Sequence, residues 1–191
     1  MNQLVISCSL SPTSHSALMA NRLVNELRKV GDETELVDLR DVSLPFCDGN
    51  ASYDDTNVAM LSAKIEAAHA VALAMPIYYY DVGGAARNLI AMTGSSWKEQ
   101  IVGLLGAAGG RSSYMSLMPI GNSLMLDFRC IILPRFVYAT RQSCGNGKLI
   151  DAAIQERLGR LAGDMHHFAS CLRQFNDSPE NSSQKCTKGS R

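Results

Sequence analysis

The sequence predicts an α/β fold, a three-layer sandwich in which helices cover both faces of a five-stranded parallel sheet. Apolar runs alternate along the 191 residues with segments whose apolar residues recur at helical spacing, which is typical of right-handed parallel crossovers. Polar or glycine-rich turns follow three of the apolar runs, at the edge where open parallel sheets bind ligands. With 46% hydrophobic residues the chain can fill one core, so we expect a single domain over residues 1–175.

Five apolar runs are predicted to be strands, and they cover residues 3–7, 33–39, 70–75, 100–107 and 130–139. The first, third and fourth runs are apolar on both faces, as central parallel strands are. The second run alternates between apolar and polar residues and belongs near an edge. These patterns favour the strand order 2-1-3-4-5, whose switch point lies between strands one and three. Pro134, inside the fifth run, predicts an edge strand or a bulge.

The segments between the strands carry apolar residues on one helical stripe, and they cover residues 16–30, 56–68, 84–92, 112–126 and 149–175. Gly31 follows the first of them as a C-terminal stop. Residues 176–191 are rich in Ser, Asn, Lys and Gly and have no aliphatic side chain to bury. We therefore predict a disordered C-terminal tail there.

The balance of charge points to a small, nearly neutral partner. Lys plus Arg and Asp plus Glu both number 18, so no net field attracts nucleic acid or an anionic membrane. The amino terminus lacks the pattern of a signal peptide, and no apolar run is long enough to span a bilayer. The six cysteines are scattered without metal-site or disulfide-framework spacing, so we expect free thiols in a reducing cytoplasm and no metal site.

The turn after the first strand reads Cys8-Ser-Leu-Ser-Pro-Thr-Ser-His-Ser16 and stands where a helix begins. Unpaired amides at a helix start and neighbouring hydroxyls can together hold a phosphate. An ordinary Ser/Thr-rich cap, which needs only one hydroxyl, is the alternative. The turn has neither the G-x-G-x-x-G of a dinucleotide fold nor the lysine of a Walker loop, so those two nucleotide folds are disfavoured.

Two further turns follow the third and fourth strands. After residues 70–75 come Pro76, Ile77 and three tyrosines, and then Gly83-Gly84 opens a helix. Because strand residues alternate faces, at most two of the tyrosines can touch one ligand, and an aromatic cluster at a subunit interface is the alternative. The turn from Gly106 to Arg111 offers glycine amides and the one cation of the three turns. Since the three strands are predicted neighbours, the turns predict one shared site.

These residues resemble the NADPH-dependent FMN reductase family of flavodoxin-like proteins over about residues 4–139. In that family a Gly-Ser-Leu-Arg-x-Gly-Ser-x-Asn turn grips the FMN phosphate, and residues 8–16 occupy its place here. The family motif Pro-x-Tyr-Asn-x-x-x-Pro-Gly-x-Leu-Lys-Asn, beside the isoalloxazine, has its counterpart at residues 76–88. Ser11 stands where the family has arginine, and Tyr79 where asparagine is usual.

The resemblance implies bound FMN, with NADPH or NADH as co-substrate, and ping-pong hydride transfer through the flavin to a quinone, an azo compound or a free flavin. It also implies a cytoplasmic homodimer or homotetramer, and no side-chain acid or base is needed. A flavin-binding module or an electron carrier without NADPH turnover is the alternative. The predicted cofactor-binding residues are Ser9, Ser11, Ser14, His15, Ser16, Pro76, Ile77, Tyr78, Tyr79, Tyr80, Gly106, Ala108, Gly109, Gly110 and Arg111.

Overall fold

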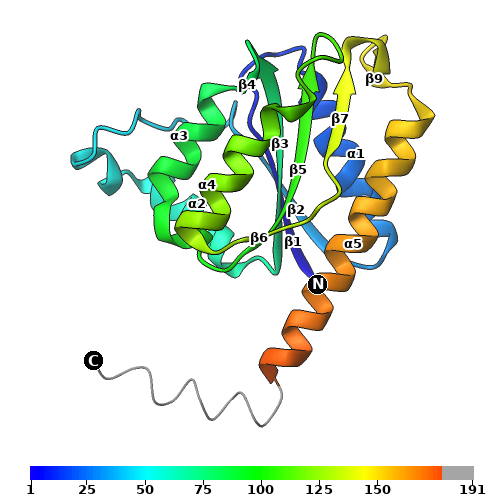
Figure 1. Cartoon of the computed structure of the whole chain (residues 1–191). Helices are drawn as coiled ribbons and strands as arrows, with labels where there is room; N and C mark the ends of the chain where they lie inside the picture. Colours follow the sequence, from blue (N-terminus) through cyan, green and yellow to red (C-terminus); the bar gives the residue numbers. More distant parts are fainter. Residues whose placement is uncertain (178–191) are drawn as a thin grey trace.

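The computed structural model describes residues 1–177 as a central parallel sheet between two layers of helices (Figure 1). Helices α1 (His15–Lys29) and α5 (Ala152–Asp177) lie on one face of the sheet. Helices α2 (Thr56–Ala67), α3 (Gly84–Thr93) and α4 (Met118–Phe128) lie on the other. The predicted three-layer sandwich is confirmed.

The parallel strands follow the predicted order. They are β1 (Asn2–Ser7), β2 (Glu33–Asp38), β3 (Ala70–Tyr78), β5 (Ile101–Ala108), β6 (Ile131–Ile132) and β7 (Val137–Thr140). From one edge, the order of the strands is β2, β1, β3 and β5. Both β6 and β7 pair with the other side of β5. The predicted fifth strand is therefore two short strands. Residue 132 pairs with 102 but 137 pairs with 105, so the chain bulges around Pro134 as expected.

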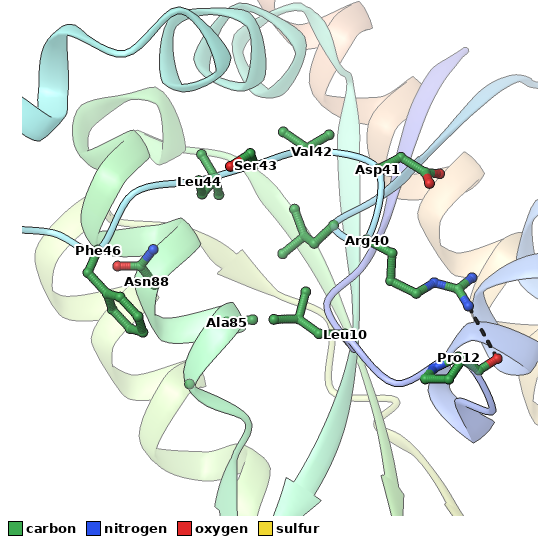
Figure 2. A pocket seen from close by; sticks show the side chains of 12 residues that line it. Leu10, Pro12, Arg40, Asp41, Val42, Ser43, Leu44, Phe46, Ala85 and Asn88 are labelled. Atoms are coloured by element: carbon green, nitrogen blue, oxygen red, sulfur yellow. Dashed lines mark hydrogen bonds between the residues drawn. The ribbon is translucent and has the colours of Figure 1, made fainter.

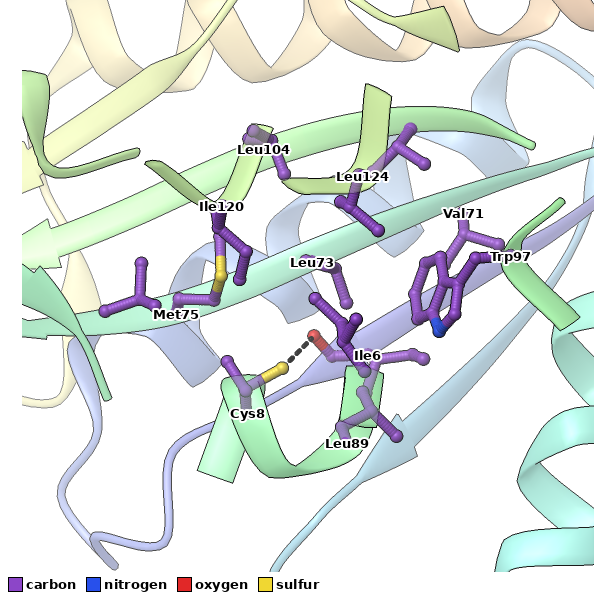
Figure 3. Close-up of a cluster of buried hydrophobic side chains, with 14 of the residues drawn as sticks. Ile6, Cys8, Val71, Leu73, Met75, Leu89, Trp97, Leu104, Ile120 and Leu124 are labelled. Carbon is purple, nitrogen blue, oxygen red and sulfur yellow. Dashed lines mark hydrogen bonds between the residues drawn. The ribbon is translucent and has the colours of Figure 1, made fainter. Parts of the chain in front are cut away.

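The three central strands are buried on both faces, and each face packs against its own layer of helices. Figure 3 shows the cluster on one face, where Ile6, Leu73 and Leu104 of the strands meet Trp97 and Leu124. The cluster on the opposite face joins alternate strand residues to α1 and α5. Because alternate residues point to opposite faces, apolar side chains at every position produce two cores around one sheet.

The predicted end of the third strand is wrong. Strand β3 does not end at Met75 but continues through Pro76 to Tyr78, and it forms a tight hairpin with β4 (Asp81–Val82). Tyr79 and Tyr80 make the turn with φ angles of 51° and 63°, so they do not alternate faces along a strand. Pro76 has no amide hydrogen to donate, but its carbonyl accepts a hydrogen bond from the Gly83 amide at 2.8 Å. The proline is therefore compatible with the hairpin.

Several short elements are additional to the predicted ones. A second hairpin, β8 (Cys144–Gly145) with β9 (Lys148–Leu149), precedes the last helix. The helix predicted to begin at residue 112 starts as a 3-10 turn, η3 (Tyr114–Leu117), before α4. The other 3-10 turns are η1 (Ala51–Asp54), η2 (Gly94–Trp97) and η4 (Arg141–Ser143).

The last helix differs from its predicted bounds at both ends, since it begins at Ala152 and runs to Asp177. Apart from its first two residues, the tail predicted to be disordered lies outside the described residues, as does Cys186. The single domain over 1–175 stays a prediction. No helix among the described residues is long and apolar enough to cross a membrane.

Candidate functional site

Serine side chains shape the turn between β1 and α1. Ser14 caps α1, and its Oγ accepts a hydrogen bond from the amide of Ala17 at 3.1 Å. The hydroxyls of Ser14 and Ser16 lie 2.9 Å apart, and Ser9 Oγ accepts from the Ser11 amide at 3.3 Å. Ser9, Ser14 and Ser16 are buried. Buried hydroxyls whose bonds are only to one another and to the turn retain capacity for a further polar partner.

The turns after β1, β3 and β5 meet around one cavity of about 290 Å³, which we call the serine pocket. Ten of the predicted site residues line it, namely Ser9, Ser11, Ser14, His15, Ser16, Pro76, Ile77, Tyr78, Ala108 and Gly109. Thr13, Ala107 and Arg141 complete the lining and were not in the predicted set. Residues of the three turns thus lie around one cavity.

Arg141 is the most informative of the residues that sequence reasoning missed. It opens η4 directly after β7, the strand beside β5, and its side chain is exposed. No salt bridge joins Arg141 to another residue in the described part of the chain. The signal was present in the sequence, since the carboxyl end of the fifth strand also reaches this edge of the sheet. A free guanidinium therefore stands at the serine pocket, although Ser11 replaces the turn arginine.

The other predicted site residues lie outside the pocket lining and are Tyr79, Tyr80, Gly106, Gly110 and Arg111. The two tyrosines are exposed at the tip of the β3–β4 hairpin, and Arg111 is exposed after β5. The Gly110 carbonyl accepts a hydrogen bond from Tyr138 Oη at 2.6 Å. A Cβ at Gly106 would lie 3.3 Å from the Leu117 side chain, a tight contact, so that glycine is favoured by packing of η3 against the sheet.

Gly109 differs from Gly106 in its surroundings. A Cβ built on Gly109 or Gly110 would meet no atom within 4 Å, and neither residue has a positive φ angle. The fold itself therefore does not require glycine at these positions. Open space beside bare backbone at a pocket suits a ligand that approaches the main chain closely. Together with the hydroxyl donors and Arg141, this opening fits a phosphate-bearing molecule with a flat ring.

Cys8 begins the turn but faces the core and not the pocket. Its side chain is buried and its Sγ donates to the Ile6 carbonyl at 3.7 Å (Figure 3). Burial, with the nearby Asp38 carboxylate, raises the pKa of the Cys8 thiol far above its usual value. The thiol therefore stays protonated, and it supplies no nucleophile. Within residues 1–177 no cluster of His, Cys, Asp or Glu could hold a metal ion.

A pocket at the switch point of a 2-1-3-4-5 sheet is where flavodoxin-like proteins bind FMN, so the fold and the serine pocket place this chain in that class. The sequence profile of the NADPH-dependent FMN reductase family matches residues 1–142. The chain belongs to this family. It is accordingly an NAD(P)H-dependent oxidoreductase whose cofactor is FMN.

Solved oxidoreductase structures share the fold. An oxidoreductase from Corynebacterium diphtheriae is 17% identical over 91% of this chain and 97% of its own, with a TM-score of 0.71. FerB from Paracoccus denitrificans, a flavoenzyme NAD(P)H:(acceptor) oxidoreductase, is 18% identical over 88% of this chain and 97% of its own, with a TM-score of 0.69. An FMN-dependent NADH-azoreductase from Bacillus anthracis, solved with FMN, is 10% identical over 86% of this chain and 99% of its own, with a TM-score of 0.66. No curated protein matched the sequence.

Proposed function

We propose that this enzyme oxidises NADPH or NADH and reduces a quinone, an azo compound or a free flavin in a ping-pong reaction, with FMN held at the serine pocket. The observation that carries the proposal is the convergence of four serines, a helix start and an unpaired arginine on one cavity. The activities of FerB and of the Bacillus azoreductase support an acceptor of this kind.

In this proposal the phosphate is held by the start of α1. Ser14 Oγ accepts a hydrogen bond from the amide of Ala17. The amides of His15 and Ser16 have no acceptor among the described residues. Those amides, the serine hydroxyls and the Arg141 guanidinium are donors suited to phosphate oxygens. Hydrogen bonds to a charged group each contribute about 1.5 to 3 kcal/mol, so a few of them offset the missing turn arginine.

The walls on either side of the phosphate donors suit the ring of the cofactor. Pro76, Ile77 and Tyr78 form one wall of the serine pocket, and Ala107 to Gly109 form another. When bound, the flavin supplies the hydride chemistry of the reaction. The chain orients the ring, keeps apolar groups beside it and offers backbone amides at its open edge, so no side chain is assigned as acid or base. We assign Arg111, outside the pocket, to the phosphate of the nicotinamide nucleotide.

We also propose a homodimer or homotetramer in the cytoplasm, with the serine pocket near the subunit contact. Large apolar side chains are exposed along the adjoining surface, at Tyr78, Tyr79, Tyr80, Met115, Met118 and Met125. A patch of this kind is typical of an interface. Cys47 and Cys171 are exposed free thiols, and a reducing compartment keeps such thiols free.

Titration with FMN, riboflavin and FAD tests the phosphate site. We expect FMN to bind most tightly to the wild-type protein. Arg141→Ala should weaken FMN binding about tenfold or more, because a charged hydrogen bond is lost, while riboflavin affinity stays unchanged. Arg111→Ala is the matched control, with unchanged FMN affinity but a raised KM for NADPH and not for NADH. Equal affinity of the wild-type protein for FMN and riboflavin would remove the phosphate site from the proposal.

Steady-state kinetics test the reaction. Varying NADPH at several fixed concentrations of a quinone should give parallel double-reciprocal plots, because one product leaves before the second substrate binds. FMN-loaded protein that oxidises no NADPH would instead be a binding module or an electron carrier. Sedimentation of the same preparation should show a dimer or tetramer, and a monomer would overturn the proposed interface.

A further inference from the structure

A second cavity, of about 680 Å³, lies against the β1–α1 turn (Figure 2). Leu10 and Pro12 line this cavity, whereas Ser9, Ser11 and Thr13 line the serine pocket. Successive residues of one turn thus present apolar groups to one cavity and hydroxyls to the other. We call the larger one the Leu10 cavity.

The walls of the Leu10 cavity come from the turn, the loop after β2 and the start of α3. Figure 2 shows Leu10 pointing toward Ala85, with Val42 and Leu44 along the loop. Leu10 is 64% exposed and Phe46, at the rim, is 87% exposed. Sites for small molecules are typically apolar hollows of about 300 to 1,000 Å³, and exposed apolar side chains around a hollow favour an apolar occupant.

The charged groups of the cavity do not favour an anion. The Arg40 guanidinium donates to both carboxylate oxygens of Asp38, at 2.6 and 3.0 Å, and to the Pro12 carbonyl at 3.4 Å. Its charge is therefore neutralised by Asp38. Asp41 also lines the cavity and has no salt-bridge partner in the region that the structure describes. The unpaired charge at the cavity is consequently negative, which disfavours phosphates and sulfonates.

The cavity is built by contacts within the protein. Asn88, on α3, accepts a hydrogen bond from the Cys47 amide at 2.9 Å and donates to the Pro45 carbonyl at 2.8 Å. These two bonds hold the loop after β2 against α3, so the hollow between them has walls fixed by the fold. They also occupy the amide group of Asn88, the remaining polar side chain on the α3 side.

We propose that the Leu10 cavity binds a small uncharged aromatic molecule, at a site separate from the serine pocket. Size, apolar walls and the unpaired Asp41 select a neutral ring compound over an anionic one. The site does not depend on the proposed function, because the β1–α1 turn separates the two cavities.

The probe is 2-naphthol, with 2-naphthalenesulfonate as the anionic control of the same ring size. Equilibrium dialysis is carried out on protein saturated with FMN. We expect 2-naphthol to bind and the sulfonate to bind at least tenfold more weakly. Asp41→Asn should bring the affinity for the sulfonate several-fold closer to that for 2-naphthol, because it removes the repulsive charge.

Two variants locate the bound probe. Phe46→Ser removes an exposed rim side chain, and Ala85→Phe fills the hollow from α3; each should weaken 2-naphthol binding about tenfold. FMN affinity, measured on the same preparations, should not change, which also shows that both variants fold. The proposal is overturned if FMN-saturated protein binds no 2-naphthol. It is equally overturned if both variants bind 2-naphthol as the wild-type protein does.

Discussion

Glycines in the turn after β5 have different reasons to be glycine. Gly106 is in the strand, where a Cβ would press on Leu117 at 3.3 Å. Gly109 directly follows that strand, which ends at Ala108, and faces open space at the serine pocket. The sequence shows only that both are glycine. The structure separates a glycine favoured by tight core packing from one whose bare backbone is available to a ligand.

Alanine at each position should therefore have opposite effects. Gly106→Ala is expected to lower the free energy of unfolding by about 1 kcal/mol or more, because the core must shift around the new methyl group. Gly109→Ala should leave that free energy nearly unchanged and weaken FMN binding several-fold. Urea unfolding and FMN fluorescence titration measure the two quantities. Loss of stability in Gly109→Ala, with FMN affinity intact, would contradict this assignment.

At the scale of elements, the β3–β4 hairpin has a strained backbone and lies beside the serine pocket. A two-residue turn with both φ angles positive favours Asn-Gly, yet here Tyr79 and Tyr80 occupy it. Tyr79 is 102% exposed, so packing within the chain does not offset its strained backbone. Strained residues of this kind are retained where function needs them. The hairpin adjoins Tyr78 in the serine pocket and lies on the surface assigned to the subunit contact.

Replacing Tyr79-Tyr80 by Asn-Gly should relieve this strain. Each left-handed tyrosine costs about 1 kcal/mol, so the double variant is expected to gain about 1 to 2 kcal/mol in free energy of unfolding. We expect it to lose NADPH oxidation and self-association. The control replaces both tyrosines by phenylalanine, which keeps the aromatic rings and the strain and should leave stability unchanged. A double variant no more stable than wild type in urea unfolding would show that the turn is unstrained.

At the scale of the whole molecule, periodicity predicted the layers and the strand order because each strand and helix buries a face whose pattern is local. Buried runs such as 70–75 identify central strands whatever surrounds them. Arg141 was missed because it lies outside the three turns on which the prediction of the site was based. Its place at the serine pocket depends on β7 pairing with β5, a contact that the predicted strand order contains but that no local pattern around Arg141 signals. The Leu10 cavity depends likewise on how an irregular loop packs on α3, and loops carry no periodic signal.

The buried side chain of Asp32 connects segments that are distant in the sequence. The buried carboxylate of Asp32, between α1 and β2, lies 2.8 Å from Gln3 Nε2 of β1 and 2.7 Å from His166 Nδ1 of α5. The Met1 amino group also donates to it at 2.8 Å. Burial raises the pKa of Asp32, but the hydrogen bonds from the amino group, His166 and Gln3 outweigh burial and hold that pKa below its usual value.

Asp32→Asn should lower the free energy of unfolding by about 3 kcal/mol at neutral pH, because the charged acceptor shared by three donors is lost. Since the folded pKa lies below the unfolded one, the stability due to Asp32 is fully present above the unfolded value of about 4. It disappears as the pH falls through the lower, folded value. The stabilities of wild type and variant should therefore begin to approach each other as the pH falls below about 4, and should coincide only below the folded pKa of Asp32. Asp127→Asn, on the exposed end of α4, is the control for loss of a carboxylate and should leave the free energy of unfolding at neutral pH nearly unchanged. A difference between Asp32→Asn and wild type that is the same at pH 7 and at pH 3 would show that the carboxylate charge contributes nothing.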